Sequence, residues 1–562
     1  MSKTNPYLDN KYALLIWAKI SIIFVIVYLR FVLYGGFSPY DHLYYINESQ
    51  HKDFLVYLGI ELSGASSARP IFGLILFTIT SLFKFNPWPY IIFLFLLWFS
   101  TVAILFHLIK SIVSRNAAFV FALLALFPIF SSTIVFDHYI AASYVFSVLL
   151  WSLSLSCLHN HVNSNNLNSY IFAYIILVFA LLTIEILLPL LSITAILPII
   201  LHIDKNRITF KKNDHRLILK YVLPVIIIAS VFFVFKVFVT PLYTGGSVWG
   251  TRPIDLKSFE FVLYYFYVVV VEIPLMMLEI VPRLFDWEIL EASVFIIAFY
   301  VLLRKKLLKN DVVGSVERCW FSKENMFIGL VVFSLFSCAV IFFISHRIPQ
   351  TYGTLNRLML PSFILLSILL AWLFEKMVIT KWFFLPVVIS VLWVSSMIVQ
   401  IDGFIESWET RKSIYNDMAM KLNSVELGND PILIACVPFY NKSNYNNESV
   451  FTKHNWSHQV GLRLFGANTI PRILSVNWNY INIYRDFSVI DDYVQYSYQL
   501  PIPTYSNFWY YEYDQEAKLS QFERIADKEE LAKKISHITE NRINYHPVIL
   551  REKIRLKLGQ LF

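Results

Sequence analysis

Three carboxylates in this chain stand beside or inside long apolar segments, where an acidic side chain is costly and marks a functional site by default. Asp41 lies in the run SPYDHLYY directly after the first apolar segment, Asp137 lies between two later segments, and Glu185 interrupts a long one. A carboxylate in such a place can accept a proton from a polar substrate. The structural alternatives are a turn after Pro39, a helix cap at Asp137 and a carboxylate paired within a helical bundle at Glu185.

Three arginines complement these acids. They are Arg69 before Pro70, Arg347 at the end of an apolar segment, and Arg357 in the pair Asn356-Arg357 that opens the next one. Arginine keeps its charge in a partly desolvated site and binds phosphate through two parallel hydrogen bonds. These side chains are therefore candidates for contact with a phosphate at the membrane surface. The alternative is that they only extend from apolar surroundings toward water.

The elements that position these residues are predicted to be membrane-spanning helices. Of the 562 residues, 57% are hydrophobic, against about 45–50% in soluble domains. Apolar runs of about 17–25 residues recur as far as residue 402, and each is long enough to span a bilayer as a helix. The first run, 12–34, is too long for a cleaved signal peptide and lacks a small-residue cleavage site.

The distribution of positive charge predicts the topology. The net charge is +8, from 47 basic and 39 acidic residues, and the basic residues concentrate in short loops near 110–115, 205–216, 304–309 and 376–381. Positively charged loops stay on the cytoplasmic side, so these clusters indicate membrane topology and not nucleic-acid binding. The first loop, 36–87, is then outside.

The expected bundle has eleven to thirteen transmembrane helices. Besides 12–34, we expect spans at about 88–108, 117–136, 139–157, two short spans within 169–201 that meet near Glu185, then 217–240, 288–303, 326–345, 359–375 and 382–402. The short apolar stretch 71–83 is expected to lie along the membrane surface. Segment 259–283 is either re-entrant with a break at Glu272-Ile273-Pro274 or crosses twice, and its sequence leaves both open.

Two domains are expected: a membrane bundle over 1–402 and a small soluble α/β or α+β domain over 403–562. The second has a predicted helix at Glu406–Leu422, a buried strand at Pro431–Val437 and a helix at about 529–540. Cys436 is its sole cysteine, so no disulfide can form within it. No CxxC or HExxH spacing occurs, and no metal site is predicted.

The order of these residues resembles the C-type glycosyltransferases, integral membrane enzymes that use polyprenyl-phosphate sugars, over about 10–400. The run from Asp41 to Tyr45 is similar to the acidic motif of their first outer loop. Asp137 resembles the acid that opens a later span, Glu185 a third characteristic position, and Arg357 the arginine that contacts phosphate. The fold implied is an all-α polytopic bundle with surface helices in the first periplasmic loop, followed by a small C-terminal α/β periplasmic domain.

Within that superfamily, the chain is most similar to the phage-type, serotype-converting O-antigen glucosyltransferases, which have an Arg-Pro element and a large C-terminal periplasmic part. Their usual Gly-Arg-Pro appears here as Ala68-Arg69-Pro70. No DxD motif is present, so no cofactor is expected and a requirement for a divalent cation stays open.

The resemblance implies an inverting transfer of a hexose, glucose in the narrower group, from undecaprenyl phosphate to a hydroxyl of lipopolysaccharide O-antigen or a similar glycan. The reaction would take place on the periplasmic side of the bacterial inner membrane. Asp41 would act as general base, Asp137 and Glu185 would orient the reactants, and Arg69, Arg347 and Arg357 would hold the phosphate.

Aromatic and histidine side chains near these positions are candidates for binding sugar rings. They are His42, Tyr44, Tyr45, His138 and Trp249. In the C-terminal domain the run Trp509-Tyr510-Tyr511 is a further candidate, although aromatic residues in such domains more often belong to the core.

Two other functions would also act on a lipid-linked glycan. A flippase or transporter would also carry acids in its spans, but such proteins usually show inverted repeats, and none is evident here. An O-antigen polymerase or ligase would use the same lipid donor, but it usually depends on a large loop between later spans. In this chain the longest loop between expected spans is the first.

Overall fold

The structure is a computed structural model that describes residues 6–37, 55–56, 70–136, 138–206, 215–235, 258–310, 322–345, 349, 354–428, 431–437, 455–477, 487–490, 493–496, 502–503, 508–514, 519–527, 529–531 and 533–534. The chain forms two compact units. Unit 1 contains Met1–Leu33 and Lys52–Val399, and unit 2 contains Tyr34–His51 and Gln400–Phe562.

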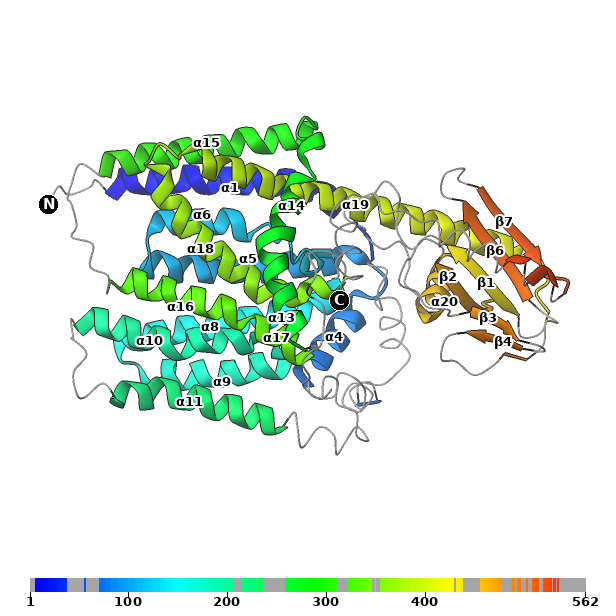
Figure 1. The fold of residues 1–562 in the computed structure, drawn as a ribbon, viewed down its shortest axis with the longest axis horizontal. Coiled ribbons are helices and arrows are strands. Elements are labelled where there is room, and N and C mark those ends of the chain that lie inside the picture. Colours follow the sequence, from blue (N-terminus) through cyan, green and yellow to red (C-terminus); the bar gives the residue numbers. More distant parts are fainter. Residues whose placement is uncertain are drawn as a thin grey trace. The chain divides into compact units, whose positions relative to one another are not determined.

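Helices make up the described part of unit 1 (Figure 1). They are α1 (Pro6–Tyr34), α4 (Pro70–Phe83), α5 (Pro87–Ile112), α6 (Arg115–Ala125), α7 (Thr133–Phe136), α8 (His138–Ser164), α9 (Leu167–Thr183), η1 (Glu185–Leu190), α10 (Leu191–Asn206), α11 (His215–Val234), α13 (Ser258–Tyr267), η3 (Val268–Glu272), α14 (Ile273–Leu278), η4 (Val281–Arg283), α15 (Trp287–Asn310), α16 (Lys323–Ser337), α17 (Ala339–Ser345), η5 (Thr354–Met359), α18 (Leu360–Val378) and α19 (Phe384–Asn423). Helices α1 and α19 end in unit 2.

Among the described residues, nine helical stretches are long and apolar enough to cross a membrane, and three shorter apolar helices accompany them at Ile71–Phe83, Arg115–Ala125 and Leu167–Thr183. The predicted all-α polytopic membrane fold is therefore confirmed. The interruption expected near Glu185 is present, because α9 ends at Thr183, Ile184 is extended, and the short 3-10 helix η1 begins at Glu185.

Segment 259–283 is helical, with an irregular turn directly before the expected break at Glu272-Ile273-Pro274. It forms one helical run, Glu260–Arg283, with a π-helical turn over Val268–Glu272. Figure 1 shows α13 and α14 running crosswise to the long helices of unit 1.

The expected continuous span 117–136 is wrong. Helix α6 ends at Ala125, a turn containing Pro128 follows, and α7 begins at Thr133. Proline cannot donate a backbone hydrogen bond, and its ring clashes with the preceding turn of a helix. All residues from Ala117 to Phe136 are buried, and irregular backbone is tolerated at membrane depth where protein covers it.

Three buried aromatic side chains donate hydrogen bonds to carbonyl groups at this break. Trp98 Nε1 donates to Ala125 O over 3.1 Å, Tyr28 OH to Leu126 O over 2.8 Å, and Trp393 Nε1 to Leu124 O over 3.1 Å and to Phe127 O over 2.9 Å. The donors come from α5, α1 and α19. Because an unpaired polar group in an apolar interior is costly, these bonds allow α6 to end inside the bundle.

Unit 2 contains a mixed sheet beside the end of α19. Its elements are β1 (Ile432–Val437), α20 (Asn455–Leu464), β2 (Arg472–Asn477), β3 (Phe487–Ile490), β4 (Tyr493–Tyr496), β5 (Ile502–Pro503), β6 (Phe508–Asp514) and β7 (Leu519–Arg524). The main sheet has the order β2-β1-β6-β7, in which β1 is parallel to β2 and β6, and β7 is antiparallel to β6. Strands β3, β4 and β5 form a second, antiparallel sheet.

The predicted strand at 431–437 is present as β1, whereas the helix expected at Glu406–Leu422 is not separate. It continues α19, which runs unbroken from Phe384 to Asn423. Gly403 alone does not stop it, because a glycine inside a helix costs only about 1 kcal/mol. The next proline after Pro386 is Pro431.

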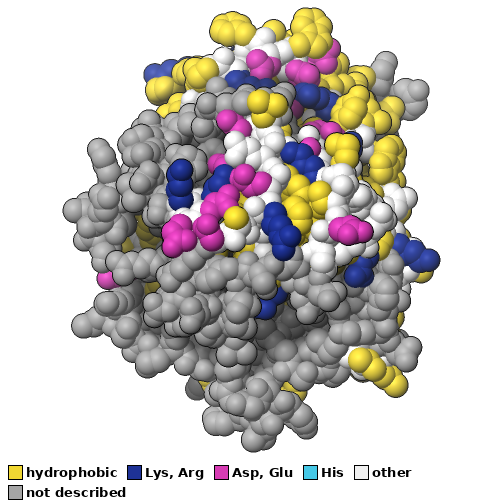
Figure 2. All heavy atoms as spheres, turned by 90° about the vertical axis from the view of Figure 1, so that its right-hand side faces the viewer, with side chains coloured by type: hydrophobic (Ala, Val, Ile, Leu, Met, Phe, Trp, Pro, Cys, Tyr) yellow, Lys and Arg dark blue, Asp and Glu magenta, His cyan; other side chains and the backbone are white. Residues whose placement is uncertain are grey.

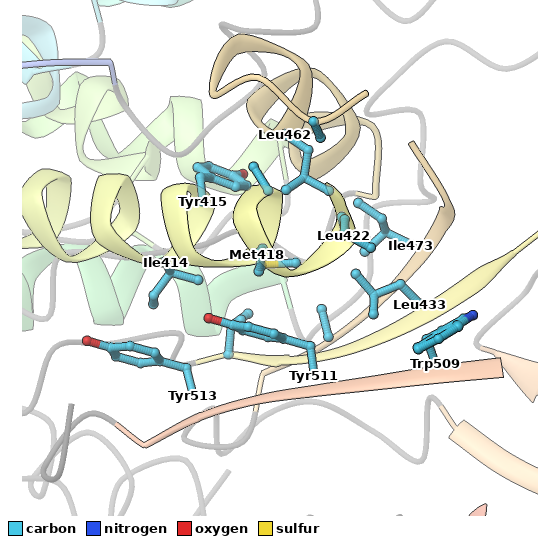
Figure 3. Close-up of a cluster of buried hydrophobic side chains, with 14 of the residues drawn as sticks. Ile414, Tyr415, Met418, Leu422, Leu433, Leu462, Ile473, Trp509, Tyr511 and Tyr513 are labelled. Atoms are coloured by element: carbon cyan, nitrogen blue, oxygen red, sulfur yellow. The ribbon is translucent and has the colours of Figure 1, made fainter. Parts of the chain in front are cut away.

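The aromatic run 509–511 belongs to the core of unit 2. Trp509 and Tyr511 belong to one buried cluster with Ile414, Met418 and residues of β1 (Figure 3), and Tyr510 is fully buried. Burial and the neighbouring carboxylate raise the pKa of the Tyr511 phenol, which therefore stays protonated and donates to Asp417 Oδ2 over 2.9 Å. The interpretation of these three side chains as core residues is therefore confirmed.

The described surface side chains carry mixed charge. Figure 2 shows acidic and basic side chains interspersed with hydrophobic ones on the face that it draws. Examples from unit 2 are the ion pairs Lys412–Glu409, at 3.4 Å, and Lys534–Glu523. A mixed surface of this kind does not create the single-sign field that steers highly charged polymers.

The substitution Trp393→Phe tests the capping of α6. We expect it to lower the free energy of unfolding by about 1–3 kcal/mol, because Leu124 O and Phe127 O each lose a buried donor. Thermal unfolding of the detergent-solubilised protein measures this. The matched control is Trp382→Phe, because Trp382 is 51% exposed. Equal midpoints for the two variants would contradict the proposed role of Trp393.

Candidate functional site

The described residues include two of the predicted site residues with their side chains, Glu185 and Arg357. His138 begins α8, but its side chain is not described. The remaining predicted site residues lie outside the described residues; they are Asp41, His42, Tyr44, Tyr45, Arg69, Asp137, Trp249 and Arg347. Their roles stay predictions, and the geometry below concerns the elements on either side of Asp137 and around Arg357.

Asn356 joins the segment before Asp137 to the segment that carries Arg357. Its Oδ1 accepts a hydrogen bond from the backbone N–H of Thr133 over 3.1 Å, although 223 positions separate the two residues. Its Nδ2 donates to Ser132 Oγ, also over 3.1 Å. The Asn356 side chain is fully buried. Both orienting bonds are therefore shielded from water, and they hold α7 against η5.

Arg357 is oriented by Tyr144 of α8. The guanidinium Nε donates to the Tyr144 hydroxyl over 3.2 Å, and its Cζ lies 5.3 Å from the centre of the same ring. A cation over an aromatic face is attracted by the negative face of the ring. Tyr144 is buried and Arg357 half-buried, so the phenol restrains an arginine at the edge of the bundle.

Glu185 starts η1 at the interruption between α9 and α10. Ile184 before it is extended, and Pro189 lies inside η1, which explains why no regular α-helix continues through this region. The Glu185 side chain is half-buried. Its position at a break in an otherwise apolar stretch keeps a carboxylate within the bundle, where a function is the default interpretation.

The elements that carry or directly precede Asp137, Glu185 and Arg357 are neighbours within unit 1. Helix α7, which leads into Asp137, contacts η5 and α8, while η1, which begins at Glu185, contacts α8 and α18. Helix α18 directly follows η5, where Arg357 lies. The fold therefore brings together segments that the sequence separates by up to 223 positions.

Sequence reasoning missed the roles of Ser132 and Tyr144 and named Asn356 only as the neighbour of Arg357. The available signal was a polar run, Ser131-Ser132-Thr133, inside an apolar segment. The hydroxyls of Ser131 and Ser143 are buried without a hydrogen-bond partner among the described residues. Such groups are rare in native proteins and call for a physical reason.

The described residues contain no group of three or more His, Cys, Asp or Glu side chains that could hold a metal ion. Asp41 and Asp137 are not among these residues. The chemistry available from the described part is therefore a restrained guanidinium, a half-buried carboxylate and several buried hydroxyl and amide groups.

Ser132 and Ser131 provide a matched pair for testing the Asn356 junction. Ser132→Ala should destabilise the protein by about 1 kcal/mol, because the buried amide of Asn356 loses an acceptor. Ser131→Ala should change stability by less than about 0.5 kcal/mol, since its hydroxyl has no described partner. The midpoints of thermal unfolding report both, and a larger loss in Ser131→Ala would mean that the junction is wrongly assigned.

No family model matches the chain, and no curated protein or solved structure is detectably similar to it. The apolar helices and the mixed sheet identify a multi-pass helical membrane protein with a small α/β unit. An assignment of activity therefore depends on the residues of the candidate site.

Proposed function

We propose that the protein is an inverting glycosyltransferase of the C-type. It moves a hexose, glucose in the narrower form of the proposal, from undecaprenyl phosphate to a hydroxyl of lipopolysaccharide O-antigen or a similar surface glycan. The reaction takes place on the periplasmic side of the bacterial inner membrane. The observation that carries the proposal is Arg357, which Tyr144 restrains beside the Asn356 junction that holds the segment before Asp137.

Arg357 suits the phosphate of a lipid donor. Its guanidinium is planar and stays charged, and it matches the geometry of phosphate oxygens. As the bond between the sugar and the phosphate breaks, negative charge grows on the phosphate oxygen. A preorganised cation in partly dry surroundings stabilises that charge. Arg69 and Arg347 are proposed as further phosphate ligands on the resemblance to the C-type enzymes.

The reaction needs one base and no covalent intermediate. The carboxylate of Asp41 accepts the proton of the acceptor hydroxyl, whose oxygen attacks the anomeric carbon from the face opposite the phosphate. The bond between the anomeric carbon and the phosphate oxygen breaks, and its electron pair leaves with the phosphate. A single displacement inverts the anomeric centre, unlike the double displacement of retaining enzymes. Asp137 and Glu185 are proposed to orient sugar hydroxyls.

Asp41→Asn tests the base. Purified wild type and variant are given polyprenyl-phosphate glucose and a defined acceptor glycan, and transfer is followed by mass spectrometry. We expect the variant to lose activity by roughly 100-fold to 10,000-fold, the usual contribution of a general base, with an unchanged unfolding midpoint. The proposal fails if wild type transfers no hexose from any lipid phosphate, or if Asp41→Asn is fully active.

Arg357→Lys and Arg357→Gln test the phosphate contact in the same assay. Lysine keeps the charge but loses the planar donor fork, so it should retain part of the activity, whereas glutamine should lose about 100-fold or more in kcat/KM. The control is Arg30→Lys, since Arg30 pairs with Glu288 over 3.4 Å and is 43% exposed. Equal effects of Arg357→Gln and Arg30→Lys on kcat/KM would contradict the proposed contact between Arg357 and the donor phosphate.

A further inference from the structure

We propose that Arg411 and Trp408 of α19 clamp the start of the loop that carries Asp41, and are thus positioning residues for the base. The inference rests on the proposed function for the role of Asp41. The clamp itself rests on contacts within unit 2, which contains both Tyr34–His51 and the C-terminal residues from Gln400 onward.

Arg411 binds the backbone of the loop directly. Its Nη1 donates to Phe37 O over 2.8 Å, across 374 positions of sequence, and the arginine is only 2% exposed. A charged donor shortens and strengthens a hydrogen bond. Because the arginine is buried, water does not compete for this bond.

Trp408 fixes the loop from a second direction. A Cβ added at Gly36 would lie 2.0 Å from Trp408 Cε2, so any side chain there would displace the indole. Phe37 packs edge-to-face on the same indole, with ring centres 6.2 Å apart. The Arg411 guanidinium lies 5.5 Å from the indole centre. The loop is therefore held through Gly36 and Phe37 by one tryptophan and one arginine.

The rest of unit 2 supports these two side chains. Phe465, just after α20, lies 6.4 Å from Trp408 and stacks on Tyr415 at 5.7 Å. A Cβ added at Gly461 of α20 would lie 2.4 Å from the Tyr415 ring, so there is no room for a side chain at this position. The orientation of Trp408 thus depends on α20, so the clamp exists only when the C-terminal unit is folded.

The covalent chain transmits this restraint to Asp41. Phe37 precedes Asp41 by four residues, which span at most ~14 Å when extended, and Pro39 between them has a restricted φ. An anchor at Phe37 therefore limits the volume that the carboxylate can visit. Loss of the anchor should lower kcat more than it changes the KM for the donor, because the proposed phosphate arginines lie elsewhere in the sequence.

Arg411→Met and Gly36→Ala test the clamp in the full-length protein in nanodiscs. Methionine fills much of the arginine's space without the donor, and alanine disturbs the contact from the loop side. The matched control is Lys412→Met, the next residue of α19, whose side chain is 46% exposed and pairs with Glu409. Two quantities are measured: amide hydrogen exchange of peptides covering 38–54, and kcat and KM with polyprenyl-phosphate glucose.

We expect exchange of 38–54 to rise at least about tenfold in Arg411→Met and Gly36→Ala and to stay unchanged in Lys412→Met. We expect kcat to fall by about 100-fold, the effect of roughly 1 Å of misplacement, with a donor KM within about twofold. Arg411→Lys should recover part of kcat. Exchange and kcat that match the Lys412→Met control in both clamp variants would overturn the inference.

The transfer assay and the exchange measurement distinguish a failure of the proposed function from a failure of the clamp. If wild type transfers no sugar, the proposed function fails, while the exchange measurement still decides whether the clamp holds the loop. If Arg411→Met does not fold, as judged by its unfolding midpoint, Gly36→Ala decides the outcome, because it changes no residue of α19. A Gly36→Ala variant with wild-type exchange would then reject the clamp.

Discussion

The fold of the membrane unit depends on satisfying the carbonyl groups at the end of α6. That helix stops inside the protein, where water cannot replace the missing backbone bonds. Trp98, Tyr28 and Trp393 donate to carbonyl groups there, of which Leu124 O and Phe127 O also accept from backbone N–H groups of the turn. An indole or a phenol suits this task, because each has one donor on a large apolar body that packs well. Three helices are thereby tied to one break, and the break becomes a rigid part of the structure.

A polar seam becomes possible once α6 can end. The residues after the turn, Ser132 and Thr133, meet Asn356 instead of continuing a helix, and Asn356 in turn places Arg357 against Tyr144. Polar side chains in a membrane protein are stable where they pair with each other within the bundle. The same bonds that remove unpaired groups also restrain the arginine that we propose as a phosphate ligand, so stability and proposed function share one network.

Unit 2 adds a different kind of restraint. A buried arginine and a tryptophan of α19 hold the residues that follow α1, and the sheet and α20 keep that part of α19 in place. We propose that the C-terminal unit thereby helps to position the base, Asp41. Long-range anchors of this kind limit motion without contacting the reacting atoms.

The sequence by itself determined the local features: the apolar runs that become helices, the interruption at Glu185 and the strand β1, because hydrophobic period and length act over a few neighbouring residues. Tertiary structure alone decided that the break at Pro128 is buried and bonded by side chains of three other helices, and that α13 and α14 run crosswise to the long helices. It also decided the pairings of Asn356 with Thr133 and of Arg411 with Phe37, across 223 and 374 positions. Those outcomes depend on which distant side chains can supply a donor, an acceptor or space, and no local pattern records that.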